Sequence, residues 1–398
     1  MFRLATAIGP FVQWSNIDGH MVNVSMSVAG PGAQPSGGGF FAHHGAGAPG
    51  VRLFRALNFR TKALITSTVL LLPTALLAWD FLSAKAEAIG FSAKERGGVA
   101  YLRDALPIVK LGQQYRLHAL QAQAEGGPTP ELAEARKALD AQLAKLDIAE
   151  TPLRTELGTA KALAAVKAAA HAAAVAGGDK TVDAHTAHIA AVLALVGQAT
   201  DGSNLTLDPD MDTYYLMDGA LGALPSFVES TAKLRGTSAA VAASGQPASE
   251  NVQRIITGSA VGTELFEGRV TAAFDKIFSV HPEYRAEFKA DDLVPQLRAF
   301  RELALGGKSD AAALIAKGTA QVNAMIALQT RMMERLDELL KVRVDAIEAQ
   351  RNLTMLAVGF ALLISGYLFC AFYLVTQGGL NEVKRRLVAP SGGDDGWR

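Results

Sequence analysis

Two long stretches without a charged residue constrain the fold of this chain more than any other feature of its sequence. The first runs from 63 to 79 (ALITSTVLLLPTALLAW) and the second from 353 to 375 (LTMLAVGFALLISGYLFCAFYLV). About 17 to 25 apolar residues in a helix cross the hydrocarbon core of a bilayer. We therefore expect two membrane-spanning helices, at 62–82 and 353–375, and Pro73 is tolerated within the first of them.

Short basic segments on the outer sides of both spans predict the orientation. These residues are Arg52, Arg55, Arg60 and Lys62 before the first span and Lys384, Arg385 and Arg386 after the second. Segments rich in Lys and Arg stay on the cytoplasmic side of a membrane. We therefore expect a two-span membrane protein with both termini in the cytoplasm and with residues 83–350 on the opposite side, which in a bacterium with two membranes is the periplasm.

The segment between the spans has the composition of long helices. Alanine, leucine, valine, glutamine and charged residues dominate it, and aromatic residues are few. Glycine and proline clusters divide it, which predicts helices at 83–124, 131–147, 151–176, 181–199, 209–243, 249–280, 291–305 and from 309 into the second span. Thr129 and Asp208 are expected to cap two of these helices.

The expected last helix carries a regular apolar stripe of Met325, Leu328, Met332, Leu336 and Leu339. Spacings of three and four residues are typical of the inner seam of a helical bundle. We therefore predict an all-α, membrane-anchored fold. Its domain at 83–350 would be a long antiparallel helical bundle, either one or two stacked four-helix bundles, between the two transmembrane helices.

The two ends of the chain lack the residues needed for a core. Residues 1–58 are rich in glycine and poor in charge, so we expect a disordered cytoplasmic segment. Residues 376–398 form a short tail whose first part, 378–388, can begin an amphipathic helix.

The composition argues against several classes of function. Lys and Arg total 38, as do Asp and Glu, so no global basic surface favours nucleic acid. The single cysteine, Cys370, lies in the second span and allows no disulfide within the chain. No phosphate loop, nucleophile elbow or His-Glu zinc motif is present. We therefore expect neither an enzyme nor a cofactor.

Two polar clusters contain residue types that bind metal ions. His185 and His188 are three residues apart on one helix face, but no third ligand is evident, and we interpret them as polar surface residues. The run Asp208, Asp210, Asp212 lacks the glycine and the distal glutamate of a calcium loop. Acids at a helix N-terminus explain this run better. We therefore predict no metal site.

Four segments resemble the sensory half of a bacterial methyl-accepting chemotaxis receptor. The first two are KERGGVAYLRDAL (94–106) and LTLDPDMDTYYLMD (205–218, followed by Leu224-Pro225 and Leu234-Arg235-Gly236). The other two are the last helix, which enters the second span, and TQGGLNEVKRRL (376–387), which is similar to the first helix of a HAMP linker. The resemblance covers about residues 55–387. It implies a periplasmic sensor that transmits a helix displacement, and a homodimer. Receptors of this family continue into a cytoplasmic signalling hairpin, so we expect a chain truncated in the HAMP linker.

The resemblance leaves the output and the ligand open. Sensor histidine kinases and diguanylate cyclases share similar input domains, and a non-signalling scaffold that binds a periplasmic protein is a further alternative. The partner would be a small periplasmic ligand, such as an organic acid or amino acid, or a periplasmic binding protein. An anionic ligand needs inward-facing arginines. Candidate binding residues are Arg96, Arg103, Arg116, Arg235 and Arg254, with Tyr115, Tyr214 and Tyr215 as walls of an adjoining pocket.

Overall fold

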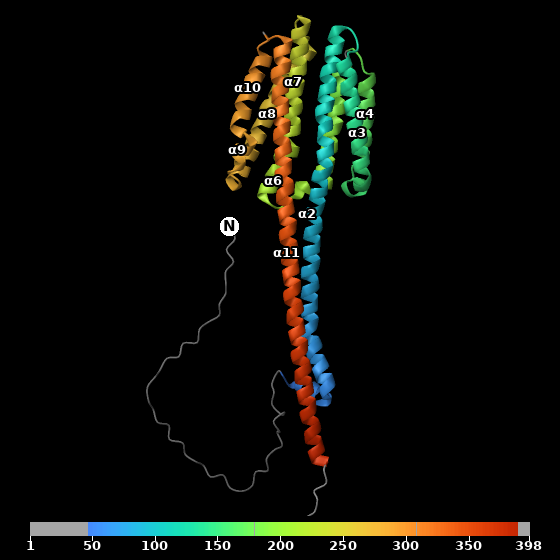
Figure 1. Ribbon diagram of the computed structural model, residues 1–398, viewed down its shortest axis with the longest axis vertical. Helices are drawn as coiled ribbons and strands as arrows, with labels where there is room; N and C mark the ends of the chain where they lie inside the picture. Colours follow the sequence, from blue (N-terminus) through green and yellow to red (C-terminus); the bar gives the residue numbers. More distant parts are fainter. Residues whose placement is uncertain (1–46, 179, 308, 389–398) are drawn as a thin grey trace, which may run out of the picture. The chain divides into compact units, whose positions relative to one another are not determined.

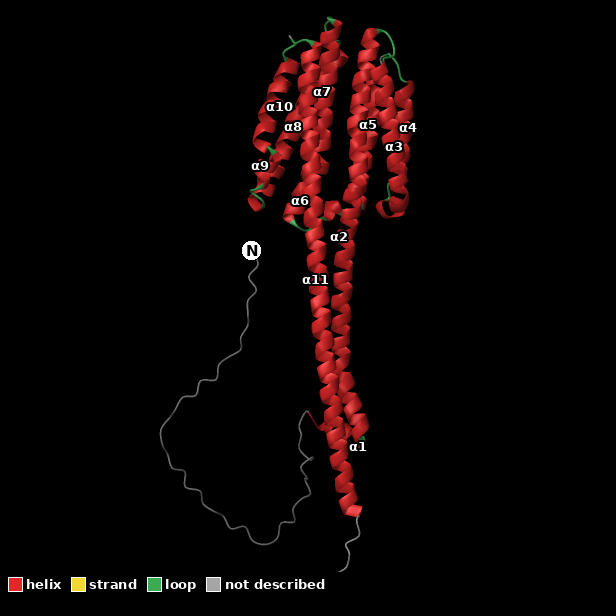
Figure 2. Ribbon diagram, viewed as in Figure 1, coloured by secondary structure: helices red, strands yellow, loops and turns green. Residues whose placement is uncertain are grey.

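The computed structural model describes residues 47–178, 180–307 and 309–388, and this part of the chain is helical throughout, without a β-strand (Figure 2). The predicted all-α class is therefore confirmed. The main helices are α1 (Ala48–Ala56), α2 (Phe59–Glu125), α3 (Pro130–Leu157), α4 (Ala160–Val175), α5 (Lys180–Gly202), α6 (Met211–Met217), α7 (Leu224–Ser244), α8 (Glu250–Val280), α9 (Tyr284–Phe288), α10 (Ala290–Leu305) and α11 (Ala311–Val388).

The chain divides into two compact units, Met1–Leu71 and Leu72–Arg398. In the smaller unit, Ala48–Ala56 forms helix α1, so the expected disorder of 1–58 does not hold there. Pro49 lies in the first turn of α1, where its fixed backbone angle favours a helix. Asn58 then starts α2 by accepting a hydrogen bond from the Thr61 backbone N–H (2.9 Å). Residues 1–46 and 389–398 lie outside the described residues.

Helices α2 and α11 are both long and apolar enough to cross a membrane. Their most apolar windows have mean hydropathies of 1.6 and 2.2, and no residue of either window is buried. In the larger unit the two helices run next to one another (Figure 1), where Thr74, Leu77, Met355 and Val358 help to line a shared apolar groove. The structure thus contains the two helices that the hydrophobic runs predicted.

The remaining helices of the larger unit form two groups that each contain one long helix (Figure 1). In the first group α4 packs on α5 and α3. The α3 residue Gln142 donates a hydrogen bond to the Asp104 carbonyl of α2 (2.8 Å). In the second group α7 packs on α8 and α11, and α10 packs on α8 and α11. Between the groups lie a short 3-10 turn at Leu205–Leu207, helix α6 and a π-helical turn at Asp218–Ala223.

The apolar stripe predicted for the last helix lies in the core. Met325, Leu328, Met332 and Leu336 are at most 1% exposed, and Leu339 packs against them. The π-helical turn packs against this stripe, because Gly219 lies next to the Met332 side chain. The structure therefore uses α11 as a wall of the core up to the point where its apolar, unburied span begins.

Several predicted helix ends are confirmed and two are corrected. Thr129 and Ser249 each accept a hydrogen bond from a backbone N–H in the first turn of α3 and α8. Helix α3 does not break at Thr151-Pro152; it ends at Gly158, whose φ of 64° suits glycine at a helix terminus. Asp208 does not cap the helix that follows it. Helix α6 begins at Met211, with Asp210 in the N-cap position.

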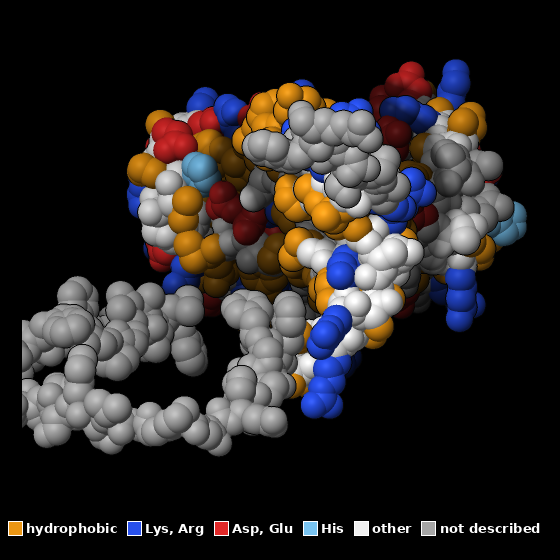
Figure 3. Space-filling model, turned by 90° about the horizontal axis from the view of Figure 1, so that it is seen from below, with side chains coloured by type: hydrophobic (Ala, Val, Ile, Leu, Met, Phe, Trp, Pro, Cys, Tyr) orange, Lys and Arg blue, Asp and Glu red, His pale blue; other side chains and the backbone are white. Residues whose placement is uncertain are grey.

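Acidic and basic side chains are interspersed on the face of the molecule seen from below (Figure 3). This distribution agrees with equal totals of 38 basic and 38 acidic residues in the sequence. Basic side chains gather on the helix end that protrudes toward the viewer (Figure 3).

Candidate functional site

The predicted binding residues do not form one site. Arg96 and Arg103 of α2 both bind the same α11 carboxylate, Asp337, at 2.9 and 3.2 Å. Arg116 and Arg235 are buried together at another level, described below. Arg254 is exposed on α8 and lies apart from these groups. The predicted arginines of α2 therefore belong to two separate polar groups at different levels of that helix, the Asp337 pairs and the buried group of Arg116 and Arg235.

A different polar cluster, which contains none of the predicted binding residues, surrounds Arg343 of α11. Its guanidinium contacts Glu95 of α2 (Nη1 to Oε2, 3.2 Å), Asp208 (Nη2 to Oδ1, 2.8 Å) and Asp210 (Nε to Oδ2, 2.7 Å). Nη2 also donates to the Thr213 hydroxyl (2.6 Å). We call these five residues the Arg343 cluster. They join both long helices to the connector that begins α6.

The local fold of the connector explains why its acids face α11. Pro209 follows Asp208, and the Asp208 carboxylate accepts a hydrogen bond from the Asp210 backbone N–H (3.0 Å). This turn holds both carboxylates on the Arg343 side. Asp212 lies elsewhere and contacts His281 at the end of α8 (3.1 Å). The acidic run therefore serves as a binding surface for an arginine, a role that sequence reasoning missed.

The electrostatics of the Arg343 cluster favour a proton on Glu95. Three carboxylates share one guanidinium, and Glu95 is fully buried. Burial, with the neighbouring Asp208 adding to it, raises the pKa of Glu95 to about 7. Glu95 Oε1 and Asp208 Oδ2 are buried without a hydrogen-bond partner in the described part of the chain. The cluster can therefore exchange a proton near neutral pH.

Tyr214 and Tyr215 follow directly after the Arg343 cluster in the chain. Their rings meet edge to face with centroids 5.3 Å apart. Tyr215 packs against the core, whereas Tyr214 is 38% exposed. The Tyr215 ring is therefore part of the core packing, and Tyr214 is its partly exposed neighbour.

The second cluster, which we call the arginine layer, consists of Gln113, Arg116, Glu229, Arg235 and Thr319. Arg116 binds both oxygens of Glu229, at 2.6 and 3.0 Å, and Gln113 Nε2 donates to Glu229 Oε2 (3.0 Å). Arg235 Nη1 donates to the Thr319 hydroxyl of α11 (3.0 Å). The layer thus joins α2, α7 and α11 in the interior.

His185 and His188 of α5 adjoin the arginine layer and are buried, so the interpretation as surface residues is wrong. Burial and the positive charge of Arg116 lower the pKa of His185 to about 4, and burial lowers the pKa of His188. Both rings are therefore neutral at pH 7. Tyr115 packs edge to face on His185, with centroids 4.6 Å apart. Within the described residues, no three His, Cys, Asp or Glu side chains are grouped so as to hold a metal ion.

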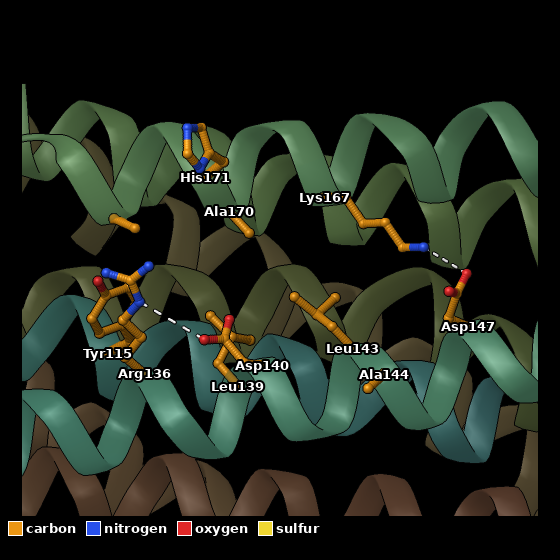
Figure 4. A pocket seen from close by; sticks show the side chains of 11 residues that line it. Tyr115, Arg136, Leu139, Asp140, Leu143, Ala144, Asp147, Lys167, Ala170 and His171 are labelled. Atoms are coloured by element: carbon orange, nitrogen blue, oxygen red, sulfur yellow. Dashed lines mark hydrogen bonds and ion pairs between the residues drawn. The ribbon is translucent and has the colours of Figure 1, made fainter.

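Tyr115 also forms part of the wall of a cavity of about 270 Å³ between α2, α3 and α4 (Figure 4). Ion pairs lie at its two ends: Arg136 with Asp140 (3.8 Å), and Lys167 with Asp147. These four charges are half exposed and balance one another. The cavity therefore offers a ligand mixed polarity without an uncompensated charge.

No protein-family model, no curated protein and no solved structure matches this chain.

Proposed function

We propose that this chain is the sensory portion of a transmembrane chemoreceptor. It binds a small periplasmic ligand in the helical domain and transmits a helix displacement across the bacterial inner membrane. The observation that carries the proposal is the continuity of α2 and α11. Each is a single helix, of 67 and 78 residues, and each contains both an apolar span and a wall of the domain core.

Hydrogen bonds and ion pairs join α2 and α11 next to their apolar spans. Lys85 Nζ donates to Gln350 Oε1 (2.8 Å), and the Arg343 cluster and the Asp337 pairs follow farther along both helices. Because each helix is unbroken, a shift of α11 in the core moves its span as well. Helix shifts of about 1–2 Å are typical of such switches. A ligand produces the shift only if it binds the two arrangements with different affinity.

The finer parts of the proposal rest on the sequence. The basic flanks place both termini in the cytoplasm, and the segments at 94–106, 205–218 and 376–387 support a chemoreceptor and a homodimer. In the proposed domain, α2 to α5 form one four-helix bundle, and α7, α8, α10 and α11 form another. The same input would serve a sensor kinase or a diguanylate cyclase, because the displacement is independent of the output domain.

Disulfide crosslinking between α2 and α11 tests the proposal. The variant Lys85→Cys/Gln350→Cys, made in a Cys370→Ala background, should form an intramolecular disulfide in membranes under mild oxidation. Organic acids and amino acids are first screened for an increase in the melting temperature of the full chain. A compound that increases it should then change the crosslinking rate. Lys85→Cys alone, which can crosslink only between two chains, is the control and reports the homodimer.

Two results would count against the receptor. One is a screen in which no small molecule changes the melting temperature while a periplasmic protein is bound, which would favour the scaffold. The other is a compound that binds and leaves the Lys85→Cys/Gln350→Cys rate unchanged, because binding would then be separate from any displacement of α11.

A further inference from the structure

The arginine layer contains more positive than negative charge. Arg116 and Arg235 are 3% and 2% exposed. The charged groups that act on Arg235 are Arg116 and Glu229. With one carboxylate for two guanidinium groups, and with His185 and His188 neutral, one positive charge is left over in the interior.

The surplus charge belongs to Arg235. Glu229 is already bound by Arg116 and Gln113 through both of its oxygens. Arg235 has the neutral Thr319 hydroxyl as a partner, and its Nε–H is buried without an acceptor in the described structure. Burial, with the neighbouring Arg116, lowers the pKa of Arg235 to about 10, so the group remains charged at pH 7. A buried charge without a counterion is strongly unfavourable, which calls for an anion at this position.

A cavity of about 400 Å³ lies one helical turn from the arginine layer. Its wall includes Leu120, Ala239 and Ile315, which are four residues from Arg116, Arg235 and Thr319 respectively. Three helices therefore place a polar residue and a cavity residue four residues apart, or about 6 Å along each axis. The layer and the cavity are neighbouring parts of one region.

The lining of this cavity is apolar apart from two side chains. Leu117, Leu120 and Ile315 contribute its larger apolar groups, and Gly236 and five alanines contribute the rest of the α7 and α11 wall. Glu125 is an exposed acid of α2 that also lines the cavity. It lies about 13 Å along α2 from Arg116 at the helical rise per residue. A ligand with one carboxylate and an aliphatic chain matches this polarity, whereas a second carboxylate would approach Glu125.

We propose that this region binds a short-chain aliphatic monocarboxylate. The carboxylate accepts the Arg235 Nε–H, which has no acceptor among the described residues. The alkyl chain lies against Leu117, Leu120 and Ile315. The pairing is charge-assisted and balances the surplus guanidinium. This assignment names the ligand class of the receptor proposed above and rests on it for its biological role.

Butyrate is the probe that tests the site. Sodium butyrate should raise the melting temperature of the full chain by several degrees in a saturable manner, following the linkage between ligand concentration and stability. Sodium chloride at equal ionic strength should not, and succinate should bind at least tenfold more weakly. Arg235→Met should weaken butyrate binding at least 100-fold by isothermal titration calorimetry. Arg254→Met, which removes an exposed arginine on α8, should leave the affinity unchanged.

A second variant tests the cavity without altering the charge. Ala239→Leu fills part of the space for the alkyl chain, so it should weaken butyrate at least tenfold while formate, which has no chain, binds as it does to the unchanged protein. An equal response to chloride and butyrate, or wild-type butyrate affinity in Arg235→Met, would overturn the site. Butyrate binding that leaves the Lys85→Cys/Gln350→Cys crosslinking rate unchanged would support the site and contradict the receptor.

Discussion

At the scale of single residues, the Arg343 cluster concentrates charge from three separate parts of the chain. Glu95 comes from α2, Asp208 and Asp210 from the connector, and Arg343 from α11. Removing a buried member, such as Glu95 or Asp208, leaves the other charges uncompensated, which is costly. The cluster therefore stabilises one relative position of the two long helices, and its strength depends on the protonation of Glu95.

The pH dependence of stability should report Glu95. Its pKa is raised from 4.5 to about 7 in the folded chain. The folded state therefore binds this proton more tightly than the unfolded state. The resulting stabilisation is complete below pH 4.5 and is lost as the pH rises through 7. The difference in free energy of unfolding between wild type and Glu95→Gln should fall by roughly 2 kcal/mol from pH 5 to pH 8.

Thermal unfolding of both proteins in detergent, followed by circular dichroism, measures that difference. Glu87→Gln removes an exposed carboxylate from the same helix and should retain the pH dependence of the wild type. If wild type and Glu95→Gln keep a constant difference over the whole range, Glu95 does not titrate in it.

Residue identity alone predicted part of these clusters. The acidic run at 208–212 and the arginines at 116 and 235 were recognisable in the sequence. The acids stand at a helix start, and the arginines lie in helices that were expected to form the domain. Their partners were not, because Asp208 and Arg343 are 135 residues apart in the chain. The burial of His185 and His188 was likewise missed. It depends on which face of α5 meets α2 and α4, and the alanine-rich α4 has little polar contrast to indicate that face.

At the scale of helices, a glycine of α5 allows the end of α5 to approach the end of α3 closely. A side chain at Gly202 would overlap the backbone carbonyl of Leu157 at the end of α3. Gly197, one and a half turns earlier on the same helix, has open space around it. These two glycines therefore have opposite consequences for stability although they share a helix.

Alanine substitutions should separate the two effects. Gly202→Ala should destabilise the domain by about 2 kcal/mol or more, because a backbone group must move to admit the methyl group. Gly197→Ala should stabilise it by up to about 1 kcal/mol, since alanine favours a helix over glycine. Chemical unfolding of both variants measures the changes. Equal effects of the two substitutions would show that α3 and α5 are not in this contact.

The prediction of helices was most accurate where the breaking residue was glycine. Gly126-Gly127, Gly245 and Gly306-Gly307 all follow helix ends near the predicted positions. At Thr151-Pro152 the sequence favoured a break, yet α3 continues to Leu157. Proline is accommodated within a helix when packing compensates for the lost hydrogen bond, and α2 contains Pro73 and Pro107 in the same way. Local propensity was therefore overruled by tertiary contacts.

At the scale of the whole molecule, the proposed function requires the helical domain and the basic flanks to face opposite sides of the membrane. The flanks are the least ambiguous signal, because Lys384, Arg385 and Arg386 follow the second span and Arg60 and Lys62 directly precede the first. A membrane-impermeant maleimide distinguishes the two sides. In a Cys370→Ala background, Ala133→Cys places an exposed thiol on α3, and Lys384→Cys places one near the end of α11.

In bacterial cells with a permeabilised outer membrane, the Ala133→Cys protein should be labelled without lysis. The Lys384→Cys protein should be labelled only after the inner membrane is broken, because the proposed orientation has its thiol in the cytoplasm. The two variants control for one another, since both sites are exposed on helices and differ in the side they occupy. Labelling of the Lys384→Cys protein in unlysed cells would reverse the proposed orientation and, with it, the assignment of the helical domain to the sensing of periplasmic compounds.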